Sequence, residues 1–271
     1  MPAINTISPD KLARLIGTPS CPALIDLRAA GDFIPGSVRR PAEGVDAWAG
    51  GIGSPAAIVI CGDGAEASPG AAAWLRHAGI RAETLEGGAG AWEAAGLPTI
   101  REAVLPPRDA RGRTIWVTRA RPKVDRIACP WLIRRFVDPS AIFLFVAPGE
   151  VAAVAERMDA APFDVESVFW SHRGELCTFD VMVAEFGLAG LQALGRLAPI
   201  VRGADTARPE IAPQAAGLLA ASLGLSRMYA DDLEQLEAGL PLYDAFYRWC
   251  RDAADETHDW VSHTPKARAR A

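Results

Sequence analysis

RGRTIWVTRARPKVDRIACPWLIRRFVD, at residues 111–138, is the stretch that says most about how this chain folds. Its first apolar run, TIWVT at 114–118, is β-branched and aromatic and predicts a strand. From Val124 onward the pattern predicts a helix with Asp125 as its N-terminal cap. Eight arginines and lysines stand against two aspartates here, although the whole chain has a net charge of −5. This local positive charge therefore needs a structural or functional explanation.

The predicted helix is apolar around most of its circumference. At about 100° per residue, its apolar side chains are Ile127, Ala128, Trp131, Leu132, Ile133, Phe136 and Val137. Such a helix is usually buried, and Arg126 lies on it close to Cys129. A buried guanidinium needs a carboxylate, carbonyl oxygens or a bound anion. Two interpretations stay open: Arg126 pairs with a carboxylate in a structural network, or it joins Arg119 in an anion site.

Length and composition indicate one large or two ordinary globular domains. Half of the 271 residues are hydrophobic and 23% are charged, which is enough for a sizeable core. The net negative charge argues against non-specific nucleic-acid binding. The five cysteines are scattered without a CxxC pair, which fits a reducing compartment better than a zinc ribbon or a disulfide framework. Neither a signal-peptide pattern nor a membrane-spanning apolar run is visible, so we expect a soluble, cytoplasmic protein without membrane or nucleic-acid partners.

Upstream of the basic stretch, residues 1–101 alternate between short apolar strands and helices. Strands are expected at 23–27, 57–60 and 82–85, and helices at 9–16, 69–77 and 91–95. This order and spacing predict an α/β domain with a parallel sheet flanked by helices. Pro106 and Pro107 mark a linker, taken as residues 102–112, before the next domain.

Cys61 stands at the carboxyl end of the apolar strand expected at 57–60. The loop GDGAEAS at 62–68 and then a helix follow it. Ligands of open α/β sheets bind at such strand ends. The N–H groups of the loop and the N-terminus of the helix can point at the sulfur and hold an anion on it. The sequence therefore makes Cys61 a candidate reactive thiol.

Residues 1–101 resemble a single rhodanese domain. The resemblance lies in DLR at 26–28, IPGS at 34–37, Cys61 with Gly64 in its loop, LEGG at 85–88, AW at 91–92 and GLP at 96–98. It implies that Cys61 accepts a sulfane sulfur as a persulfide from a small donor, thiosulfate or a persulfide, and passes it to a thiol acceptor. It also implies an anion cradle with Asp26 and Arg28 in support. The cradle residues are Gly62, Asp63, Gly64, Ala65, Glu66, Ala67 and Ser68.

The cradle loop departs from the rhodanese pattern. Rhodaneses usually hold an arginine or lysine there to receive an anionic donor, whereas this loop carries Asp63 and Glu66 and looks one residue longer. Carboxylates near the thiol oppose its ionisation and repel thiosulfate. An alternative therefore stands beside the sulfurtransferase, namely a rhodanese scaffold that binds a partner without catalysis.

Downstream, residues 113–255 are expected to form a mixed, mostly helical α+β domain, followed by a polar basic tail at 256–271. A strand is expected at 141–146, and the last two helices at 231–236 and 242–250. A tail of that composition carries too few apolar side chains to join a core.

A hairpin is expected around the turn formed by Arg173 and Gly174. Its arms would place His172, Glu175 and Cys177 on one face of the pair of strands. Three interpretations stay open for that face: a structural cross-strand pair, an oxyanion site, or a metal site formed by these three residues. A metal ion is the one cofactor that the sequence suggests.

Most of residues 113–250 resemble the C-terminal domain of the chromate-resistance protein family. The matching strings are WV at 116–117 with Arg119, DRIACPWLIRR at 125–135, FLFV at 143–146, CTFD at 177–180, FGL at 186–188, IVRGAD at 200–205 and YD at 243–244. The resemblance implies a role in chromate or related oxyanion stress and brings no catalytic mechanism with it. A divalent tetrahedral oxyanion needs arginine forks or helix N-termini, and Arg119, Arg126 and His172 are the candidates.

Two functions follow from these resemblances. The first is a rhodanese-like sulfurtransferase that carries sulfane sulfur on Cys61 and takes part in the response to chromate or another oxyanion. The second is a non-catalytic rhodanese scaffold with a C-terminal sensory domain that binds an oxyanion, chromate or sulfate, or a metal ion.

Overall fold

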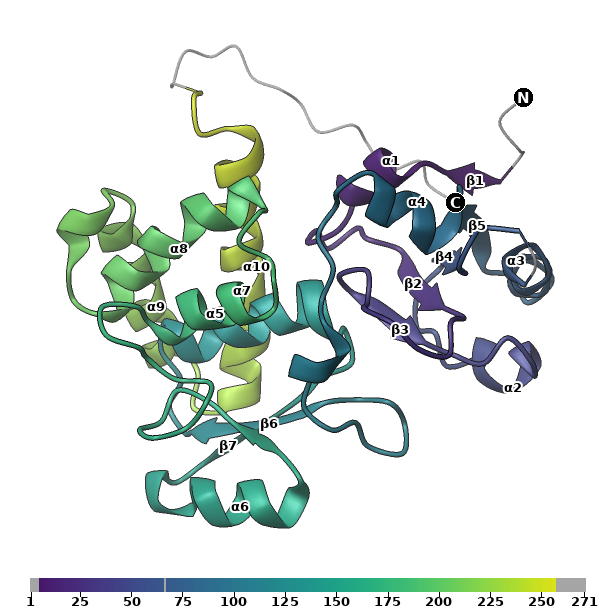
Figure 1. The fold of residues 1–271 in the computed structure, drawn as a ribbon. Helices are drawn as coiled ribbons and strands as arrows, with labels where there is room; N and C mark the ends of the chain where they lie inside the picture. Colours follow the sequence, from purple (N-terminus) through teal and green to yellow (C-terminus); the bar gives the residue numbers. More distant parts are fainter. Residues whose placement is uncertain (1–4, 66, 257–271) are drawn as a thin grey trace.

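The computed structural model describes residues 5–65 and 67–256 (Figure 1). Its first half contains a five-stranded parallel sheet with the order β1-β5-β4-β2-β3. The strands are β1 (Thr6–Ile7), β2 (Ala23–Asp26), β3 (Ser37–Arg39), β4 (Ala56–Ile60) and β5 (Arg81–Leu85). The three strands that the sequence predicts are confirmed as β2, β4 and β5. The short edge strands β1 and β3 escape prediction because two or three residues carry too little periodic signal.

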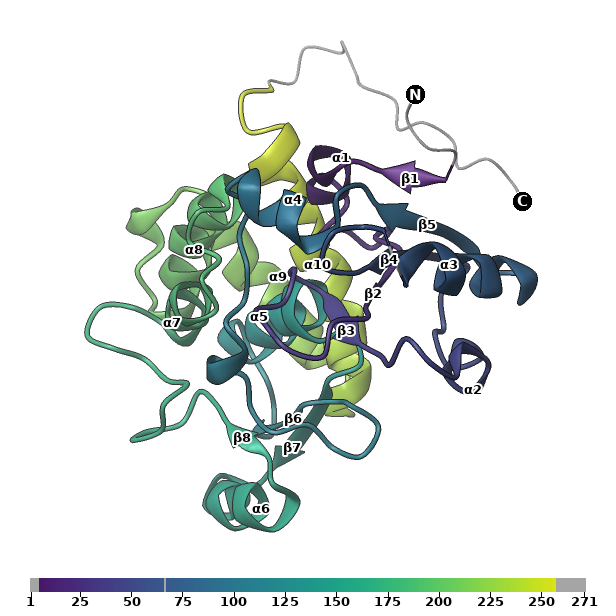
Figure 2. The same ribbon diagram turned by 45° about the vertical axis from the view of Figure 1, so that its right-hand side comes forward.

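Helices cover both faces of this sheet. They are α1 (Pro9–Ala13), α2 (Val45–Ala49), α3 (Ser68–His77) and α4 (Gly88–Ala94). Successive residues of a strand face opposite sides, so Ala57 and Val59 of β4 pack with α2 and α3, whereas Ile58 and Ile60 join the cluster that contains α1 and α4. Figure 2 shows α3 on the side away from the second half of the chain and α4 on the nearer side. The predicted α/β architecture, a parallel sheet flanked by helices, is confirmed.

One hydrophobic cluster runs through both halves of the chain. It joins Ile34 and Trp92 of the first half to Trp131 and Phe136 of the second. A Cβ added to Gly17 would lie 2.3 Å from the ring of Phe136, so the chain after α1 lies directly against that ring. The N–H of Gly36, in the IPGS turn, donates to the carbonyl of Phe136 at 2.5 Å. Because the core is shared, the domain limits proposed from the sequence stay a prediction.

The second half is mostly helical around a small parallel sheet with the order β7-β6-β8. Its strands are β6 (Ile115–Arg119), β7 (Ile142–Val146) and β8 (Ala161–Pro162). Its helices are α5 (Asp125–Leu132), η2 (Ile133–Val137), η3 (Pro148–Glu150), α6 (Val151–Met158), α7 (Thr178–Glu185), α8 (Gln192–Asp205), η4 (Pro209–Ile211), α9 (Ala215–Met228) and α10 (Asp232–Asp252), and η1 (Glu102–Val104) lies in the segment that joins the halves. The tail expected at 256–271, apart from Glu256, lies outside the described residues.

Helix α5 is buried as its apolar circumference predicts, and α10 anchors it. Trp131 is fully buried and donates through its indole N–H to Asp244 of α10 at 2.8 Å. Pro130 stands inside the helix, which continues as the π-helical turn η2. A proline removes one helix donor and distorts the turn around it.

The prediction of two closing helices was wrong, because α10 runs without a break through Pro241. A single missing donor costs less than the packing of α10 against α5 and α8 supplies. Within the described residues, no helix combines the length and the apolar character that crossing a bilayer requires.

Candidate functional site

The first candidate site surrounds Cys61, the residue that follows the central strand β4. The side chain is almost fully buried, at 8% exposure. Its Sγ accepts the N–H of Gly64 at 3.1 Å and lies 3.2 Å from the hydroxyl oxygen of Ser68, the first residue of α3. The loop thus closes around the sulfur at the carboxyl edge of the sheet, and it brings Gly64 and Ser68 of the expected cradle to the sulfur.

Glycines decide the shape of this loop. Gly64 has a φ of +84°, a conformation that residues with a side chain rarely adopt. A Cβ on Gly88 would lie 2.4 Å from the carbonyl oxygen of Cys61, because the LEGG segment packs directly beneath the loop. The N–H of Ala89 also donates to that carbonyl at 2.8 Å. The glycines of the rhodanese resemblance therefore position the cysteine through backbone contact.

The charge around Cys61 is negative. One carboxylate oxygen of Asp63 lies 3.9 Å from Sγ and accepts the N–H of Ala65 at 3.0 Å. In the described part of the chain, no arginine or lysine forms an ion pair with this loop, and Glu66 lies outside that part. A thiolate here would be stabilised by an N–H and a hydroxyl group, with a carboxylate opposing it.

Asp26 and Arg28 form a structural pair at the same edge of the sheet. Arg28 donates twice to the fully buried carboxylate of Asp26, at 3.0 and 2.9 Å, and once to the carbonyl of Asp32 at 2.6 Å. Asp26 is the register partner of Ile60, the residue before the cysteine. The pair therefore fixes the end of β2 beside Cys61.

The second candidate site is a carboxylate–histidine cluster formed by Asp125, Asp164, His172 and Asp205. The Nε2 atom of His172 lies 3.5 Å from Asp125 Oδ2, 3.4 Å from Asp164 Oδ1 and 3.2 Å from Asp205 Oδ2. Ligand atoms of Asp125, Asp164 and His172 all lie within 4.8 Å of one another. The imidazole is 40% exposed, whereas Asp125 is fully buried. The cluster therefore opens to solvent on the side of His172.

The cluster is assembled from α5, α8 and the loop between β8 and α7, which carries both Asp164 and His172. Asp125 is the first residue of α5, and Asp205 is the last residue of α8. Asp164 follows β8, and its N–H donates to the carbonyl of Trp170 at 2.9 Å, which closes the loop that leads to His172. Trp170 stacks on Phe186 with ring centroids 4.7 Å apart and thereby fixes that loop on the core. Segments far apart in the sequence thus meet at one imidazole.

The prediction that Asp125 caps its own helix was wrong. Its side chain makes no capping bond to α5 and instead reaches the N-terminus of α7. Oδ2 accepts the N–H groups of Thr178 at 2.6 Å and Phe179 at 3.3 Å, whereas Oδ1 is buried without a hydrogen-bond partner among the described residues. The preceding Val124 has φ 28° and ψ −92°, a strained conformation for a β-branched residue.

The basic side chains Arg119 and Arg126 both turn toward Asp164. Arg126 Nε and an Nη of Arg119 lie 3.2 and 3.3 Å from Asp164 Oδ2. Arg126 also donates to the carbonyls of Arg119 and Ala120, at 3.1 and 3.0 Å. The guanidinium groups expected to receive an oxyanion are thus neutralised by a carboxylate. This contact agrees with the interpretation in which Arg126 pairs with a carboxylate in a structural network.

The electrostatics of the cluster favour a positive charge at its centre. Hydrogen bonds with Asp125, Asp164 and Asp205 raise the pKa of His172 to about 12. Burial, and then the negative charge of Asp205, raise the pKa of Asp125 to about 7. Burial would raise the pKa of Asp164, but the hydrogen bond from His172 and the charge of Arg126 bring it below its usual value. Three carboxylates around one imidazole favour a cation over an anion.

The structure does not bring Glu175 and Cys177 to His172. Glu175 is 81% exposed and pairs with Arg208, and Cys177 is fully buried at the start of α7. The expected hairpin register was wrong: an isolated bridge joins Arg173 to Leu176, so that Gly174 and Glu175 form the turn. Helix α7 begins at Thr178, directly after Cys177, so the second arm of the predicted hairpin does not form.

The sequence pattern missed Asp164, because an aspartate after an irregular segment carries no periodic signal. Asp205 stands in the conspicuous string VRGAD at 201–205, yet nothing local shows which residue it meets. The strain at Val124 is visible only in three dimensions.

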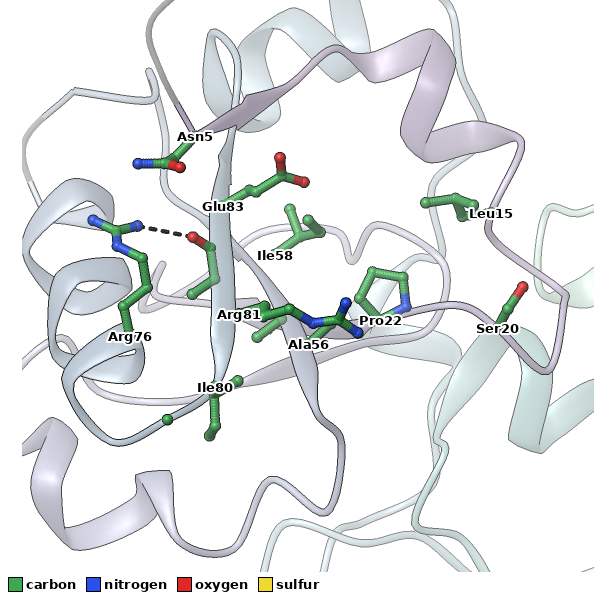
Figure 3. A pocket seen from close by; sticks show the side chains of 13 residues that line it. Asn5, Leu15, Ser20, Pro22, Ala56, Ile58, Arg76, Ile80, Arg81 and Glu83 are labelled. Atoms are coloured by element: carbon green, nitrogen blue, oxygen red, sulfur yellow. Dashed lines mark hydrogen bonds between the residues drawn. The ribbon is translucent and has the colours of Figure 1, made fainter. Parts of the chain in front are cut away.

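A hollow of about 620 Å³ lies elsewhere, at the amino ends of β4 and β5 (Figure 3). Arg76 of α3 lies at one side of it and donates to the carbonyl of Ala82 at 2.8 Å. Ala56 and Arg81, which begin their strands, lie on its wall, whereas Cys61 is at the opposite edge of the sheet. This hollow is therefore separate from the Cys61 site.

The fold and the two sites define a protein in which a rhodanese-like α/β unit with a strand-end cysteine is joined to a helical domain with a carboxylate–histidine cluster. Residues 116–250 match the family described as "ChrB, C-terminal domain". Protein ChrB of Cupriavidus metallidurans is 37% identical over 147 residues, which cover 53% of this chain and 43% of that protein. The chain therefore matches less than half of that relative's length.

Solved structures resemble the N-terminal part of the chain. A rhodanese-related protein from Thermoplasma volcanium has a TM-score of 0.32 and 21% identity, covering 36% of this chain and 98% of that one. A thiosulfate sulfurtransferase from Pseudomonas aeruginosa has a TM-score of 0.31 and 29% identity, covering 36% of this chain and 19% of that one. These likenesses concern the fold.

Proposed function

We propose that this protein is a rhodanese-like sulfur carrier that acts in the response to chromate or a related oxyanion, with Cys61 as the residue that becomes a persulfide. The observation that carries the proposal is the position of its sulfur at the carboxyl end of the central strand, where it accepts the N–H of Gly64 at 3.1 Å. The ChrB C-terminal domain and the matched strings of the chromate-resistance family support the oxyanion context.

The proposed chemistry is a pair of sulfur transfers without net oxidation. The Cys61 thiolate attacks the sulfane sulfur of the donor, so that an Sγ–S bond forms while the S–S bond of the donor breaks. The electron pair of that bond leaves with the rest of the donor, as sulfite or as a thiolate. An acceptor thiolate then attacks the outer sulfur of the persulfide and restores the Cys61 thiolate.

The carboxylate of Asp63 favours one class of donor. Thiosulfate carries two negative charges, and a carboxylate oxygen 3.9 Å from Sγ repels it. A low-molecular-weight persulfide carries less charge at neutral pH. We therefore expect a cysteine-derived persulfide to load Cys61 faster than thiosulfate does.

The test is the intact mass of the full chain after incubation with thiosulfate and, separately, with a cysteine-derived persulfide. The expected result is a gain of one sulfur atom that disappears in Cys61→Ser and remains in the control Cys21→Ser, whose thiol lies outside the loop. A gain that survives in Cys61→Ser would contradict the proposal, and so would the lack of any gain from both donors.

The second candidate function is a rhodanese scaffold with a sensory C-terminal domain. The acidic surroundings of Cys61 favour it: Asp63 lies 3.9 Å from Sγ, and no described arginine or lysine forms an ion pair with the loop, which weakens the case for turnover with an anionic donor. If the domain senses chromate or sulfate through Arg126, an Arg126→Ala protein should bind that anion more weakly in calorimetry. Equal affinity in the variant would exclude this form of sensing.

A further inference from the structure

We propose that the carboxylate–histidine cluster is a binding site for a divalent first-row transition-metal ion, with Asp125, Asp164 and His172 as ligands and Asp205 as a fourth. The proposal is independent of sulfur carriage by Cys61. It replaces the ligand set His172, Glu175 and Cys177 that local spacing suggests.

The spacing of the ligand atoms fits a single ion. At bond lengths of about 2.1 Å, neighbouring ligand atoms lie about 3.0 Å apart in an octahedral site and about 3.4 Å apart in a tetrahedral one. The three oxygens lie 3.2 to 3.5 Å from His172 Nε2. Small side-chain rotations would therefore let one ion replace the proton that the imidazole now shares with the carboxylates.

A buried oxygen without a partner also supports Asp125 as a ligand of the metal ion. Oδ1 of Asp125 has no hydrogen-bond partner among the described residues, although the side chain is fully buried. Leaving such an acceptor unsatisfied costs about 1–3 kcal/mol, and more for a charged group. A bound cation would satisfy the whole Asp125 carboxylate and reduce the repulsion between Asp125 and Asp205, both of which lie within 3.5 Å of His172 Nε2.

The proposed ligands are already oriented by other groups. The N–H groups of Thr178 and Phe179 hold Asp125, and the hydroxyl of Thr178 donates to Asp164 at 3.0 Å. The N–H of Asp125 itself donates to Asp205 Oδ1 at 3.3 Å. Metal sites characteristically fix their ligands with such outer contacts. A carboxylate held in this way loses little conformational entropy when it binds an ion.

The donor set indicates which ions fit. Carboxylate oxygens with one imidazole suit Mn²⁺, Fe²⁺ or Zn²⁺ better than Ca²⁺, which prefers oxygen alone, or Cu⁺, which prefers sulfur. The cysteines on the neighbouring helices, Cys129 and Cys177, are fully buried, and burial raises the pKa of each thiol well above its usual value. Because His172 is 40% exposed, an ion bound there would keep coordination positions open to water or a small ligand.

The experiment titrates the tag-free, EDTA-treated full chain with two metal ions in turn. Binding of Mn²⁺ is measured by calorimetry and by the loss of the EPR signal of free Mn²⁺. Binding of Zn²⁺ is measured by calorimetry. The wild type should bind one ion. Asp125→Asn and His172→Gln should each weaken binding by at least about tenfold. Glu175→Gln is the matched control, because Glu175 lies in the same segment but pairs with Arg208, and it should bind as the wild type does.

Asp125→Asn also removes charge from the contact with α7, so its thermal melting is measured alongside. His172→Gln keeps the proposal testable if Asp125→Asn fails to fold, because His172 is half-exposed. Failure of the wild type to bind either ion would overturn the proposal and leave a pure salt-bridge network. Unchanged affinity in His172→Gln, or a loss of affinity in Glu175→Gln alone, would also overturn it.

Discussion

The Cys61 loop and the carboxylate–histidine cluster are built in opposite ways. The loop is one continuous segment, in which Cys61, Gly64 and Ser68 contact one another within eight residues of chain. The cluster draws Asp125 from α5, Asp205 from α8, and Asp164 and His172 from the loop between β8 and α7, and only packing brings these three segments together. A site of the first kind depends on local backbone geometry, whereas a site of the second kind depends on the anchoring of whole helices.

The largest effect is expected from Gly88→Ala. The new Cβ would meet the carbonyl oxygen of Cys61 at 2.4 Å, at a φ of +59°, so the loop must move. We expect sulfur loading of Cys61 to be lost and the free energy of unfolding to fall by about 3 kcal/mol. Intact mass and urea unfolding measure the two effects.

The matched control for that change is Gly70→Ala. Gly70 lies in α3 with open space around its Cβ position. This substitution should retain sulfur loading and raise stability by about 0.5–1 kcal/mol. Equal loading by the two variants would show that the LEGG segment does not position the cysteine.

The next effect concerns the pH dependence of two thiols outside the Cys61 loop, Cys21 and Cys250. Burial raises the pKa of Cys21 to about 12 and that of Cys250 to about 11, so both stay protonated and unreactive near neutrality. Below those values, each unit of pH raises the thiolate fraction about tenfold. Alkylation of Cys21 and Cys250 by iodoacetamide should therefore accelerate about a hundredfold from pH 7 to pH 9, as peptide mass mapping would measure. An alkylation rate of Cys250 that does not change between pH 7 and pH 9 would contradict a buried, protonated thiol at this position.

A smaller effect is expected where α5 is anchored. Asp244 accepts two hydrogen bonds from Arg135 and one from Trp131, all at 2.8 Å. Asp244→Asn should lower the free energy of unfolding by about 2 kcal/mol, because the partly buried guanidinium loses its counter-charge. If the cluster depends on helix anchoring and the Cys61 loop does not, Asp244→Asn should reduce the Mn²⁺ affinity of the cluster by a larger factor than it reduces sulfur loading of Cys61.

Glu237→Gln is the control for the anchoring prediction. Glu237 of α10 is 61% exposed and pairs with Arg134 of η2, the turn that continues α5. Surface pairs of this kind contribute about 0–1 kcal/mol, so urea unfolding should place this variant close to the wild type. A cost as large as that of Asp244→Asn would mean that exposed charge, rather than the buried anchor, holds α5.

The smallest effect concerns donor choice at Cys61. A unit charge about 4 Å away is worth about 1 kcal/mol in water, and Asp63 lies 3.9 Å from Sγ. Asp63→Asn should therefore speed loading by thiosulfate about fivefold and leave loading by a persulfide nearly unchanged. Asp46→Asn, an exposed carboxylate of α2, should change neither rate. A fivefold gain with both donors would point to a change in loop structure instead of charge.

The amino-acid sequence by itself determined the features whose cause is local. The apolar run of β4 made a buried parallel strand, Cys61 followed it, and the apolar circumference of α5 required burial. Strand and helix periodicities depend on neighbouring residues, so they are readable without a fold. The glycines that shape the Cys61 loop are also adjacent to what they shape or belong to a recognisable string.

Only the tertiary structure decided what the charged residues do. Asp125 caps α7 instead of its own helix, Arg126 meets Asp164, and Glu175 turns away to Arg208. The bridge between Arg173 and Leu176 places Glu175 in the turn, away from His172. The physical reason is that the interaction of two charges depends on their distance and burial, and residues tens of positions apart acquire a distance only when the helices pack.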